Sequence, residues 1–330
     1  MENEKKDGKF LSVEDIEVVY TAGGDIVHAV NHVSFDLKRG ETFGLVGETG
    51  AGKTTIAKTI LRILPDPPAK VLGGHVYLDG EDLYAKSEEE MLKVRGDKIA
   101  MIFQDPMTAL NPLMSVGDQI LEVLLLHNDY DRATAVKKVR EMLEMVGIPG
   151  GRYEEYPHQF SGGMKQRVVI AMALACNPEL VLADEPTTAL DVTIQAQVLD
   201  LIQALKEKYN TAMILITHDL GVVAQTCDKV AVIYAGEIVE AGSRAAIFDH
   251  PTHPYTRGLF GSLPDITKDE SRLHPIEGMP PDPTNLPEGC AFGPRCKYAT
   301  EACRQKKIPL TELTPGHYCR CYVKTTEEAR

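Results

Sequence analysis

Hydrophobic and polar residues alternate along two early segments of the chain, which is the pattern of half-buried β-strands. Phe10–Tyr20 alternates weakly and Val30–Leu37 more clearly, so we expect these two strands to pair. Short apolar runs predict further buried strands at Glu41–Val46, His75–Leu78, Ile99–Phe103, Glu179–Ala183 and Ala212–Thr217.

Apolar residues spaced three and four apart predict helices between these strands. In Arg132–Val146, for example, one apolar face contains Val139 and Leu143, Asp131 can cap the start and Gly147 can cap the end. Because helices alternate with apolar strands, we expect an α/β fold with a largely parallel sheet. The same spacing predicts helices at Ile56–Leu64, Ser115–His127, Gln166–Cys176 and Val192–Tyr209.

The chain is expected to contain more than one part, since 330 residues exceed what one compact core usually holds. A helical subdomain is predicted at about residues 105–178, inserted within a first domain of residues 1–247. From Phe248 the periodicity fades and prolines cluster, so residues 248–330 form a predicted extension. Such a tail buries little core by itself and should lie on another surface or be held by its cysteines.

Charge and hydropathy narrow the classes of function. The net charge is −13 without a long Lys/Arg cluster, which argues against a surface that tracks nucleic-acid phosphates. The longest apolar run, Val168–Cys176, is far shorter than the ~18–20 residues that span a bilayer. The N-terminus is charged and lacks the apolar core of a secretion signal. We therefore expect a cytoplasmic protein that only a partner could hold at a membrane.

A glycine-rich stretch between a predicted strand and a predicted helix carries the clearest chemistry. Glycines let successive backbone N–H groups curl around a phosphate, and the following helix adds its positive end. Lys53 would hold the β- and γ-phosphates of a nucleotide, and Thr54 would ligate Mg²⁺. The alternative is a glycine-rich surface turn. The predicted phosphate loop consists of Gly47, Glu48, Thr49, Gly50, Ala51, Gly52, Lys53, Thr54 and Thr55.

Two further motifs fit the same chemistry. The apolar strand before Asp184 and Glu185 ends in two carboxylates, of which Asp184 would anchor Mg²⁺ and Glu185 would polarise a water molecule. A strand ending in solvated acids is the alternative. Ser161, Gly162 and Gly163 stand at a predicted helix start and form a second candidate anion site.

With these motifs the chain resembles the ATP-binding subunits of ABC transporters over almost its whole length. The motifs follow the family order: Gly47–Thr55, Gln104, Ser161–Gly163, Asp184-Glu185, Asp191 and His218. Met164 stands where the broad family usually has Gln, a departure common in the peptide-transport branch. The resemblance implies a P-loop NTPase (RecA-like) core with an antiparallel β subdomain, a helical insertion and an irregular cysteine-containing extension.

The resemblance assigns the remaining site residues. Tyr20 matches the aromatic residue that stacks on adenine, with an ordinary strand tyrosine as the alternative. Gln104 would contact Mg²⁺ or water, His218 would contact the γ-phosphate and orient the water, and Asp191 would lie at the contact between two ATPase subunits.

The resemblance also implies an assembly. In this family each ATP lies between the phosphate loop of one subunit and the signature sequence, here Ser161–Gly163, of the other. The chain has one of each, so it needs a second ATPase chain, homologous or identical. Two membrane permease subunits and, indirectly, an extracellular binding protein are further expected partners, at the cytoplasmic face of the membrane. Apolar residues after Gln104 would contact the permease or instead fill the core: Met107, Leu110, Leu113 and Met114.

Five of the seven cysteines lie near the C-terminus. Cys290, Cys296, Cys303 and Cys321 match the cysteine pattern of the extension found in oligopeptide, dipeptide and nickel importers, with Cys319 as the alternative fourth residue. Some members of this branch bind a [4Fe–4S] cluster there. Four thiolates also suit Zn²⁺, but the close Cys-x-x-Cys pairs of zinc ribbons are lacking, which favours Fe–S. Unligated loop cysteines are the third possibility.

These features together predict the ATPase subunit of an importer for di- or oligopeptides, which catalyses ATP + H₂O → ADP + Pi with Mg²⁺. A nickel or other small-solute importer ATPase of the same branch is the alternative. A soluble ABC ATPase acting on nucleic acid or ribosomes is a rival of another class, disfavoured by the peptide-branch tail. A metal-regulated module with silent ATPase is disfavoured by the intact Lys53, Asp184, Glu185 and His218.

Overall fold

The computed structural model describes residues 8–188, 191–262 and 276–322, and the chain divides into two compact units. The first unit contains the described residues of 1–36, 43–82 and 217–330. The second contains 37–42 and 83–216, again as far as they are described. The predicted domain boundary at residue 247 stays a prediction.

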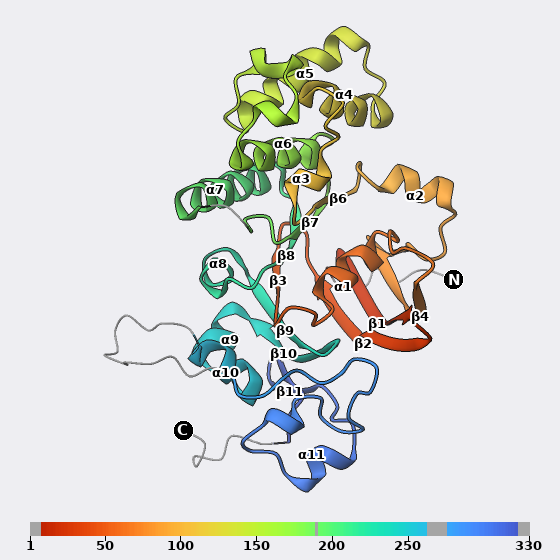
Figure 1. Ribbon diagram of the computed structural model, residues 1–330, viewed down its shortest axis with the longest axis vertical. Helices are drawn as coiled ribbons and strands as arrows, with labels where there is room; N and C mark the ends of the chain where they lie inside the picture. The colour runs from red at the N-terminus through yellow and green to blue at the C-terminus, as the bar shows by residue number, and fades with distance from the viewer. Residues whose placement is uncertain (1–7, 189–190, 263–275, 323–330) are drawn as a thin grey trace. The chain divides into compact units, whose positions relative to one another are not determined.

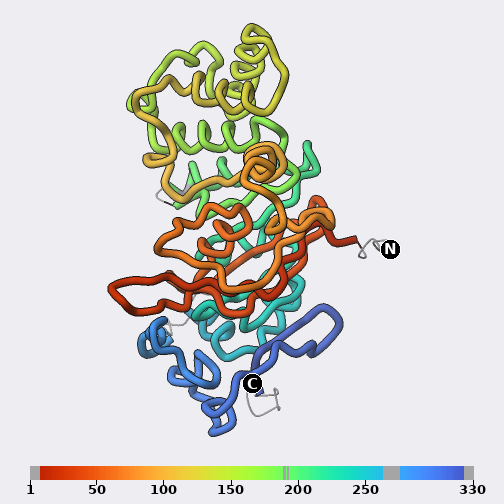
Figure 2. The backbone as a smooth tube through the Cα atoms, turned by 90° about the vertical axis from the view of Figure 1, so that its right-hand side faces the viewer, coloured from red at the N-terminus to blue at the C-terminus, as the bar shows by residue number. Residues whose placement is uncertain are grey.

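An antiparallel sheet forms the N-terminal part of the first unit. Its strands are β1 (Leu11–Ala22), β2 (Asp25–Leu37), β4 (Ala69–Leu78) and β5 (Glu81–Asp82), in the order β2-β1-β4-β5. The predicted pairing of the first two strands is confirmed, and Figure 2 traces their long hairpin in red. Leu11, Ser12 and Val13 at the start of β1 are all buried, so this strand is more buried than its weak alternation predicts.

A mixed sheet carries the phosphate loop in the same unit. β3 (Thr42–Val46) is parallel to β9 (Lys229–Tyr234), which forms a hairpin with the antiparallel β10 (Glu237–Ser243). Every residue of β3 is buried, which explains its continuous apolar run. The accompanying helices are α1 (Lys53–Ile60), α8 (Leu220–Thr226), α9 (Arg244–Asp249) and α10 (Pro254–Gly261).

The predicted helix at Ile56–Leu64 differs from the observed one at its end. α1 stops at Ile60, and Arg62 adopts a left-handed φ of 53°. The amides of Arg62 and Ile63 turn back to the carbonyls of Thr59 and Lys58 at 3.0 Å each. The apolar spacing continues past Ile60, but the chain has already turned toward β4, so the predicted end was wrong.

The C-terminal extension is integrated into the first unit. It contains η3 (Gly293–Arg295), α11 (Glu301–Gln305), β11 (Thr311–Thr314) and β12 (His317–Cys319). β12 pairs antiparallel with β10, and β11 pairs with β12, so the tail extends the mixed sheet. The expectation that the tail lies on another surface is confirmed.

The second unit combines a parallel sheet with a helical region. β6 (Ile99–Ile102), β7 (Leu180–Asp184) and β8 (Ala212–Ile216) are parallel neighbours, as the alternation of strands and helices predicts. In Figure 1 the predicted helical insertion appears in yellow to green. The helices of this unit are α2 (Glu88–Val94), α3 (Pro106–Ala109), α4 (Val116–His127), α5 (Arg132–Met145), η1 (Gly150–Glu154), η2 (Pro157–Gln159), α6 (Gly162–Leu174) and α7 (Val192–Tyr209).

Candidate ATP site

The phosphate loop joins β3 to α1, as the sequence predicts. Gly47 (φ 155°) and Gly52 (φ 100°) both approach other backbone closely: a Cβ would lie 2.1 Å from the Ile233 oxygen and 2.3 Å from the Ala29 oxygen, respectively. α1 starts at Lys53 without a side-chain cap on its first turn. The positive end of the helix therefore adjoins the loop, which suits an anion.

Lys53 is held by the loop itself. Its ammonium donates to the carbonyl oxygens of Gly47 and Glu48, at 2.9 Å each, and the residue is only 6% exposed. These contacts fix a positive charge within the glycine-rich turn. On the neighbouring β1, the hydroxyl of the half-buried Tyr20 lies 3.4 Å from the Thr55 hydroxyl. Tyr20 therefore lies beside the first turn of α1, and its stacking on adenine stays a prediction.

The second unit contains the pair of carboxylates. Asp184 is the buried last residue of β7, and Glu185 follows it in a left-handed conformation with φ 46°. The Glu185 amide donates to the Ile216 carbonyl at 2.8 Å. The left-handed conformation of Glu185 coincides with the end of β7 at Asp184.

Two donors hold the Glu185 carboxylate. Gln104 Nε2 donates to Oε2 at 3.0 Å, and the Thr188 hydroxyl donates to the same oxygen at 2.8 Å. The sequence placed Gln104 and Glu185 in one site, and the fold of the second unit brings them into direct contact. Thr188 was not predicted; the hydroxyl residues that follow Pro186 are the signal that could have identified it.

Ser161 and Asp191 each begin a helix of the second unit. Ser161 caps α6 by accepting from the Met164 amide at 3.4 Å, and Gly162 starts the helix at the surface. Gly163 packs against α7, because a Cβ there would lie 2.6 Å from Ile194 Cγ2. Asp191 caps α7 by accepting from the Ile194 amide at 2.9 Å. The exposed N-terminus of α6 retains the character of an anion site.

His218 lies in the first unit, on the exposed link between β8 and α8. The adjacent Asp219 caps α8 by accepting from the amides of Gly221 and Val222 at 2.9 and 3.2 Å. The candidate residues are thus divided between the units. The first contains Tyr20, Gly47–Thr55 and His218, and the second contains Gln104, Ser161–Gly163, Asp184, Glu185 and Asp191.

The C-terminal cysteines do not form a metal site in this arrangement. Among the described residues, no group of three or more His, Cys, Asp or Glu side chains is placed to hold a metal ion. Cys290 and Cys303 do lie in neighbouring loops, with the Cys290 amide 2.7 Å from the Cys303 carbonyl. Burial raises the pKa of the Cys290, Cys296 and Cys319 thiols, which favours the neutral form, whereas metal ligands are thiolates. The predicted [4Fe–4S] or Zn²⁺ ligand set is therefore not supported.

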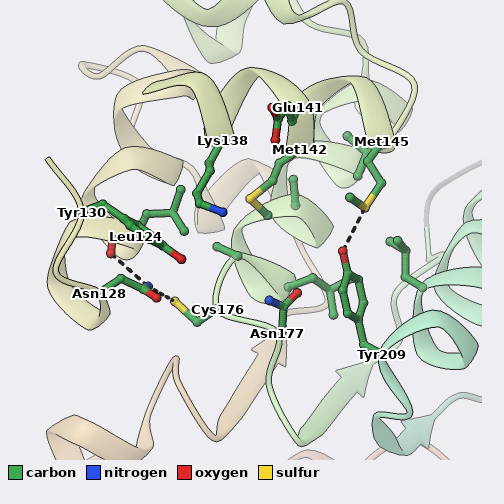
Figure 3. A pocket seen from close by; sticks show the side chains of 15 residues that line it. Leu124, Asn128, Tyr130, Lys138, Glu141, Met142, Met145, Cys176, Asn177 and Tyr209 are labelled. Carbon is green, nitrogen blue, oxygen red and sulfur yellow. Dashed lines mark hydrogen bonds between the residues drawn. The ribbon is translucent and has the colours of Figure 1, made fainter. Parts of the chain in front are cut away.

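A separate cavity of about 130 Å³ lies in the second unit, among the helices shown in Figure 3. The side chain of Asn128 donates to Cys176 Sγ at 3.6 Å on one wall, and the Tyr209 hydroxyl contacts Met145 Sδ at 3.7 Å on another. None of the predicted site residues lines it. The cavity is therefore not part of the candidate ATP site.

A glycine-rich loop that holds a buried lysine and a strand that ends in two carboxylates define a P-loop ATP-binding cassette. Residues 30–188 match the family described as ABC transporter, and residues 239–303 match the family described as oligopeptide/dipeptide transporter, C-terminal region. The chain belongs to the ABC transporter family, in the branch of dipeptide and oligopeptide transport ATP-binding proteins. It is accordingly an ATP-binding and ATP-hydrolysing protein.

Several relatives match nearly the full length. The dipeptide transport ATP-binding protein DppD of Bacillus subtilis (strain 168) is 50% identical over 318 residues, which are 96% of this chain and 95% of that protein. The oligopeptide transport ATP-binding protein OppD of the same organism is 49% identical over 318 residues, or 96% and 89% of the two chains. A solved structure of the ATP-binding cassette MJ0796, dimeric and bound to ADP and Pi, matches with a TM-score of 0.64 and 28% identity, covering 71% of this chain and 98% of that one.

Proposed function

We propose that this chain is the ATP-hydrolysing subunit of an importer for di- or oligopeptides, and that it drives transport through separate permease subunits. The observation that carries the proposal is the phosphate loop that holds Lys53, and the Gln104–Glu185 contact within the second unit supports it. The near full-length similarity to dipeptide and oligopeptide transport proteins supports the substrate class. A nickel or other small-solute importer is the alternative within the same branch.

The proposed reaction is ATP + H₂O → ADP + Pi. Lys53 and the loop amides would bind the β- and γ-phosphates, and Thr54 and Asp184 would hold Mg²⁺, which would neutralise phosphate charge. Tyr20 stacks on the adenine ring. These groups bind and orient the nucleotide before any bond is broken.

Glu185 acts on the attacking water in this proposal. Two neutral donors, Gln104 and Thr188, fix the direction of its carboxylate without cancelling its charge. A carboxylate so held can accept a proton from a water molecule placed in line with the γ-phosphate. Gln104 would also contact Mg²⁺ or water and so link nucleotide state to the helical region, and His218 would orient the water.

The working form is a dimer of ATPase chains. Because the chain has one phosphate loop and one signature, Ser161–Gly163, each ATP would be held between the loop of one subunit and the signature of the other. Asp191 would lie at that contact. The dimeric form of the similar cassette MJ0796 is consistent with this assembly. We favour a heterodimer with a homologous chain over a homodimer.

A permease contact is proposed on the second unit, after Gln104. Of the apolar residues there, Leu113 is 85% exposed and Met107 is 61% exposed, whereas Leu110 is buried at 4%. Leu110 therefore fills the core, and the two exposed side chains are available to a membrane subunit. No helix in the described ranges is long and apolar enough to cross a bilayer. We place the chain at the cytoplasmic face of the membrane, held by the permease.

Replacing Glu185 by Gln tests the mechanism. The variant should bind ATP but lose nearly all turnover, since the amide cannot accept the proton, and it should accumulate as an ATP-bound dimer in size-exclusion chromatography. Glu141→Gln, on an exposed face of α5, is the matched control and should hydrolyse ATP like the wild type. Unchanged turnover of Glu185→Gln would remove Glu185 from the role of base.

The substrate class needs the assembled transporter. With permease and binding protein reconstituted in vesicles, di- or oligopeptides should stimulate ATP hydrolysis and nickel should not. Stimulation by nickel alone would favour the alternative importer.

A [4Fe–4S] cluster on Cys290, Cys296, Cys303 and Cys321 or Cys319, with Zn²⁺ as the alternative, remains a proposal from the sequence. Binding would require these loops to rearrange and the thiols to ionise. Iron, zinc and acid-labile sulfide should be measured in anaerobically purified protein. Absence of both metals would dismiss the proposal.

A further inference from the structure

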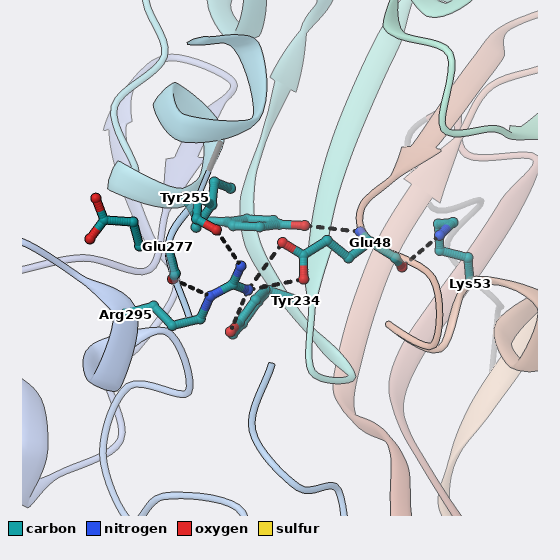
Figure 4. A network of polar contacts seen from close by, with 7 residues as sticks. Glu48, Lys53, Tyr234, Tyr255, Glu277 and Arg295 are labelled. Atoms are coloured by element: carbon teal, nitrogen blue, oxygen red, sulfur yellow. Dashed lines mark hydrogen bonds and ion pairs between the residues drawn. The ribbon is translucent and has the colours of Figure 1, made fainter. Parts of the chain in front are cut away.

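The phosphate loop contains a carboxylate of its own, Glu48, between Gly47 and the segment that leads to Lys53. The Glu48 carbonyl is one of the two oxygens that accept from Lys53 (Figure 4). The side chain is 26% exposed. An ionised carboxylate this close to the binding site for a polyphosphate opposes nucleotide binding unless a cation neutralises it.

That cation comes from the C-terminal extension. Arg295 Nη1 lies 3.1 and 3.0 Å from Oε1 and Oε2 of Glu48, and the arginine side chain is only 7% exposed. Backbone carbonyls of Ile276 and Glu277 accept from the same guanidinium at 3.3 and 3.1 Å. The Tyr234 hydroxyl accepts at 3.2 Å. The tail therefore holds Arg295 in one position against the loop, 247 residues away from Glu48 along the chain.

The pKa of Arg295 agrees with this arrangement. Burial alone would lower it, but the hydrogen bonds to Glu48 and Tyr234 outweigh burial and raise it. The guanidinium stays charged in any case. The pair is mostly screened from solvent, so its charge cancellation is stronger than at an exposed site.

A second contact from the tail fixes the loop backbone. The hydroxyl of Tyr255, from α10, accepts from the Glu48 amide at 2.9 Å. Its ring is fully buried against Tyr234 and Phe292, with centroids 4.6 and 5.4 Å apart. Burial raises the pKa of Tyr255, so the phenol remains neutral. The Glu48 amide is thus directed at Tyr255, while the Glu48 carbonyl accepts from the Ala51 amide at 3.2 Å as well as from Lys53, so the backbone of Glu48 is held on both sides.

We propose that Arg295 and Tyr255 are positioning residues of the phosphate loop, which neutralise and orient Glu48 so that the loop can receive the phosphates of ATP. The proposal rests on the proposed function, since it takes Gly47–Thr55 as the ATP site. It makes the C-terminal extension a working part of that site: without Arg295, the negative charge of Glu48 opposes the nucleotide and competes for Lys53.

A double-mutant cycle in the full-length chain tests the electrostatic part. The dissociation constant of Mg²⁺ and a non-hydrolysable ATP analogue is measured by calorimetry for wild type, Arg295→Gln, Glu48→Gln and the double variant. Arg295→Gln should weaken binding by about tenfold, more at low salt than at high salt. On the Glu48→Gln background the same substitution should change binding by less than about twofold, because there is no charge left to neutralise.

Kinetics separate positioning from catalysis. Arg295→Gln should raise KM for ATP while kcat stays close to the wild-type value, because the charge pair acts on binding. Arg295→Lys should restore part of the affinity relative to Arg295→Gln, since lysine keeps the positive charge but lacks the planar guanidinium with its several N–H donors. Tyr255→Phe keeps the buried ring and should weaken binding by a smaller factor, about threefold, through release of the Glu48 amide.

Lys307→Gln is the matched control. Lys307 forms an ion pair between the tail and the sheet, with Glu237 of β10 at 2.9 Å, and Glu237 lies outside the phosphate loop. This variant should bind the nucleotide like the wild type. Equal weakening by Arg295→Gln on both Glu48 backgrounds, or no weakening at all, would overturn the proposal. Unchanged binding in Lys53→Ala would instead show that the ATP site itself is misassigned.

Discussion

Gly52→Ala is predicted to damage the phosphate loop through a backbone collision. Gly52 has φ 100°, and a Cβ there would lie 2.3 Å from the carbonyl oxygen of Ala29 on β2. That distance is about 1 Å shorter than ordinary carbon–oxygen contact, and the obstacle is backbone within a paired strand, which cannot rotate away. The loop must therefore move, and its movement displaces Lys53, which directly follows Gly52.

The magnitude follows from two contributions. An alanine at this φ is strained by about 1–2 kcal/mol, and displacement of packed backbone adds about 1–3 kcal/mol. We expect Gly52→Ala to lower the free energy of unfolding by about 2–5 kcal/mol, the sum of the two contributions. Binding of an ATP analogue should weaken more than tenfold, because the loop amides and the Lys53 ammonium leave their common geometry.

Gly50→Ala isolates the strain. Gly50 also has a positive φ, 81°, but no atom lies within 4 Å of its added Cβ. Gly50→Ala should lower the free energy of unfolding only by the strain of about 1–2 kcal/mol, roughly half the effect of Gly52→Ala. Urea unfolding followed by circular dichroism measures this difference. If the two variants were equally destabilised, the close approach to β2 would not be the reason for glycine at position 52.

Two other predictions concern stability. Burial, followed by the influence of Arg320, lowers the pKa of His253 to about 3 from an ordinary 6.5. Between these two pH values the imidazole takes up a proton only in the unfolded chain, so the free energy of unfolding falls as the pH drops below about 6.5. Between pH 7.5 and 5 the wild type should lose about 2 kcal/mol more than His253→Asn, which can still cap α10, in urea unfolding; equal losses would refute the assignment. Asp131→Ala removes the acceptor of the Thr134 amide at the start of α5 and should lower the unfolding free energy by about 1 kcal/mol, whereas the exposed Lys137→Ala should not.

Local sequence patterns predicted many of the helices and strands, because interactions between residues near each other in the chain determine where these elements form and end. The apolar face of α5, its cap at Asp131 and its left-handed end at Gly147 all follow from residues within one helix. The continuous apolar runs of β3 and β7 predicted fully buried parallel strands. The motif spacing predicted which loops carry phosphate-binding and acidic residues.

The tail could not be predicted in the same way. All four residues of β11 are exposed, and β12 has only three residues, so neither has a hydrophobic pattern. Their pairing with β10 depends on backbone hydrogen bonds and on the contact of His317 with the buried Glu240 at 2.8 Å. Such partners are distant in the chain, and no hydrophobic periodicity in the sequence indicates that they will meet. The Arg295–Glu48 pair is missed for the same reason.

The two carboxylates of the proposed ATP machinery are held by different kinds of donor, and this difference separates their roles. A guanidinium pairs with Glu48 and holds it in place, which suits that carboxylate to shaping the loop. Neutral donors from Gln104 and Thr188 orient Glu185 and leave its charge available to a water molecule. The kinetics should therefore divide cleanly: Arg295→Gln weakens ATP binding and keeps kcat, whereas Glu185→Gln keeps binding and loses kcat. If both variants changed the same constant, the assignment of one carboxylate to binding and the other to chemistry would be wrong.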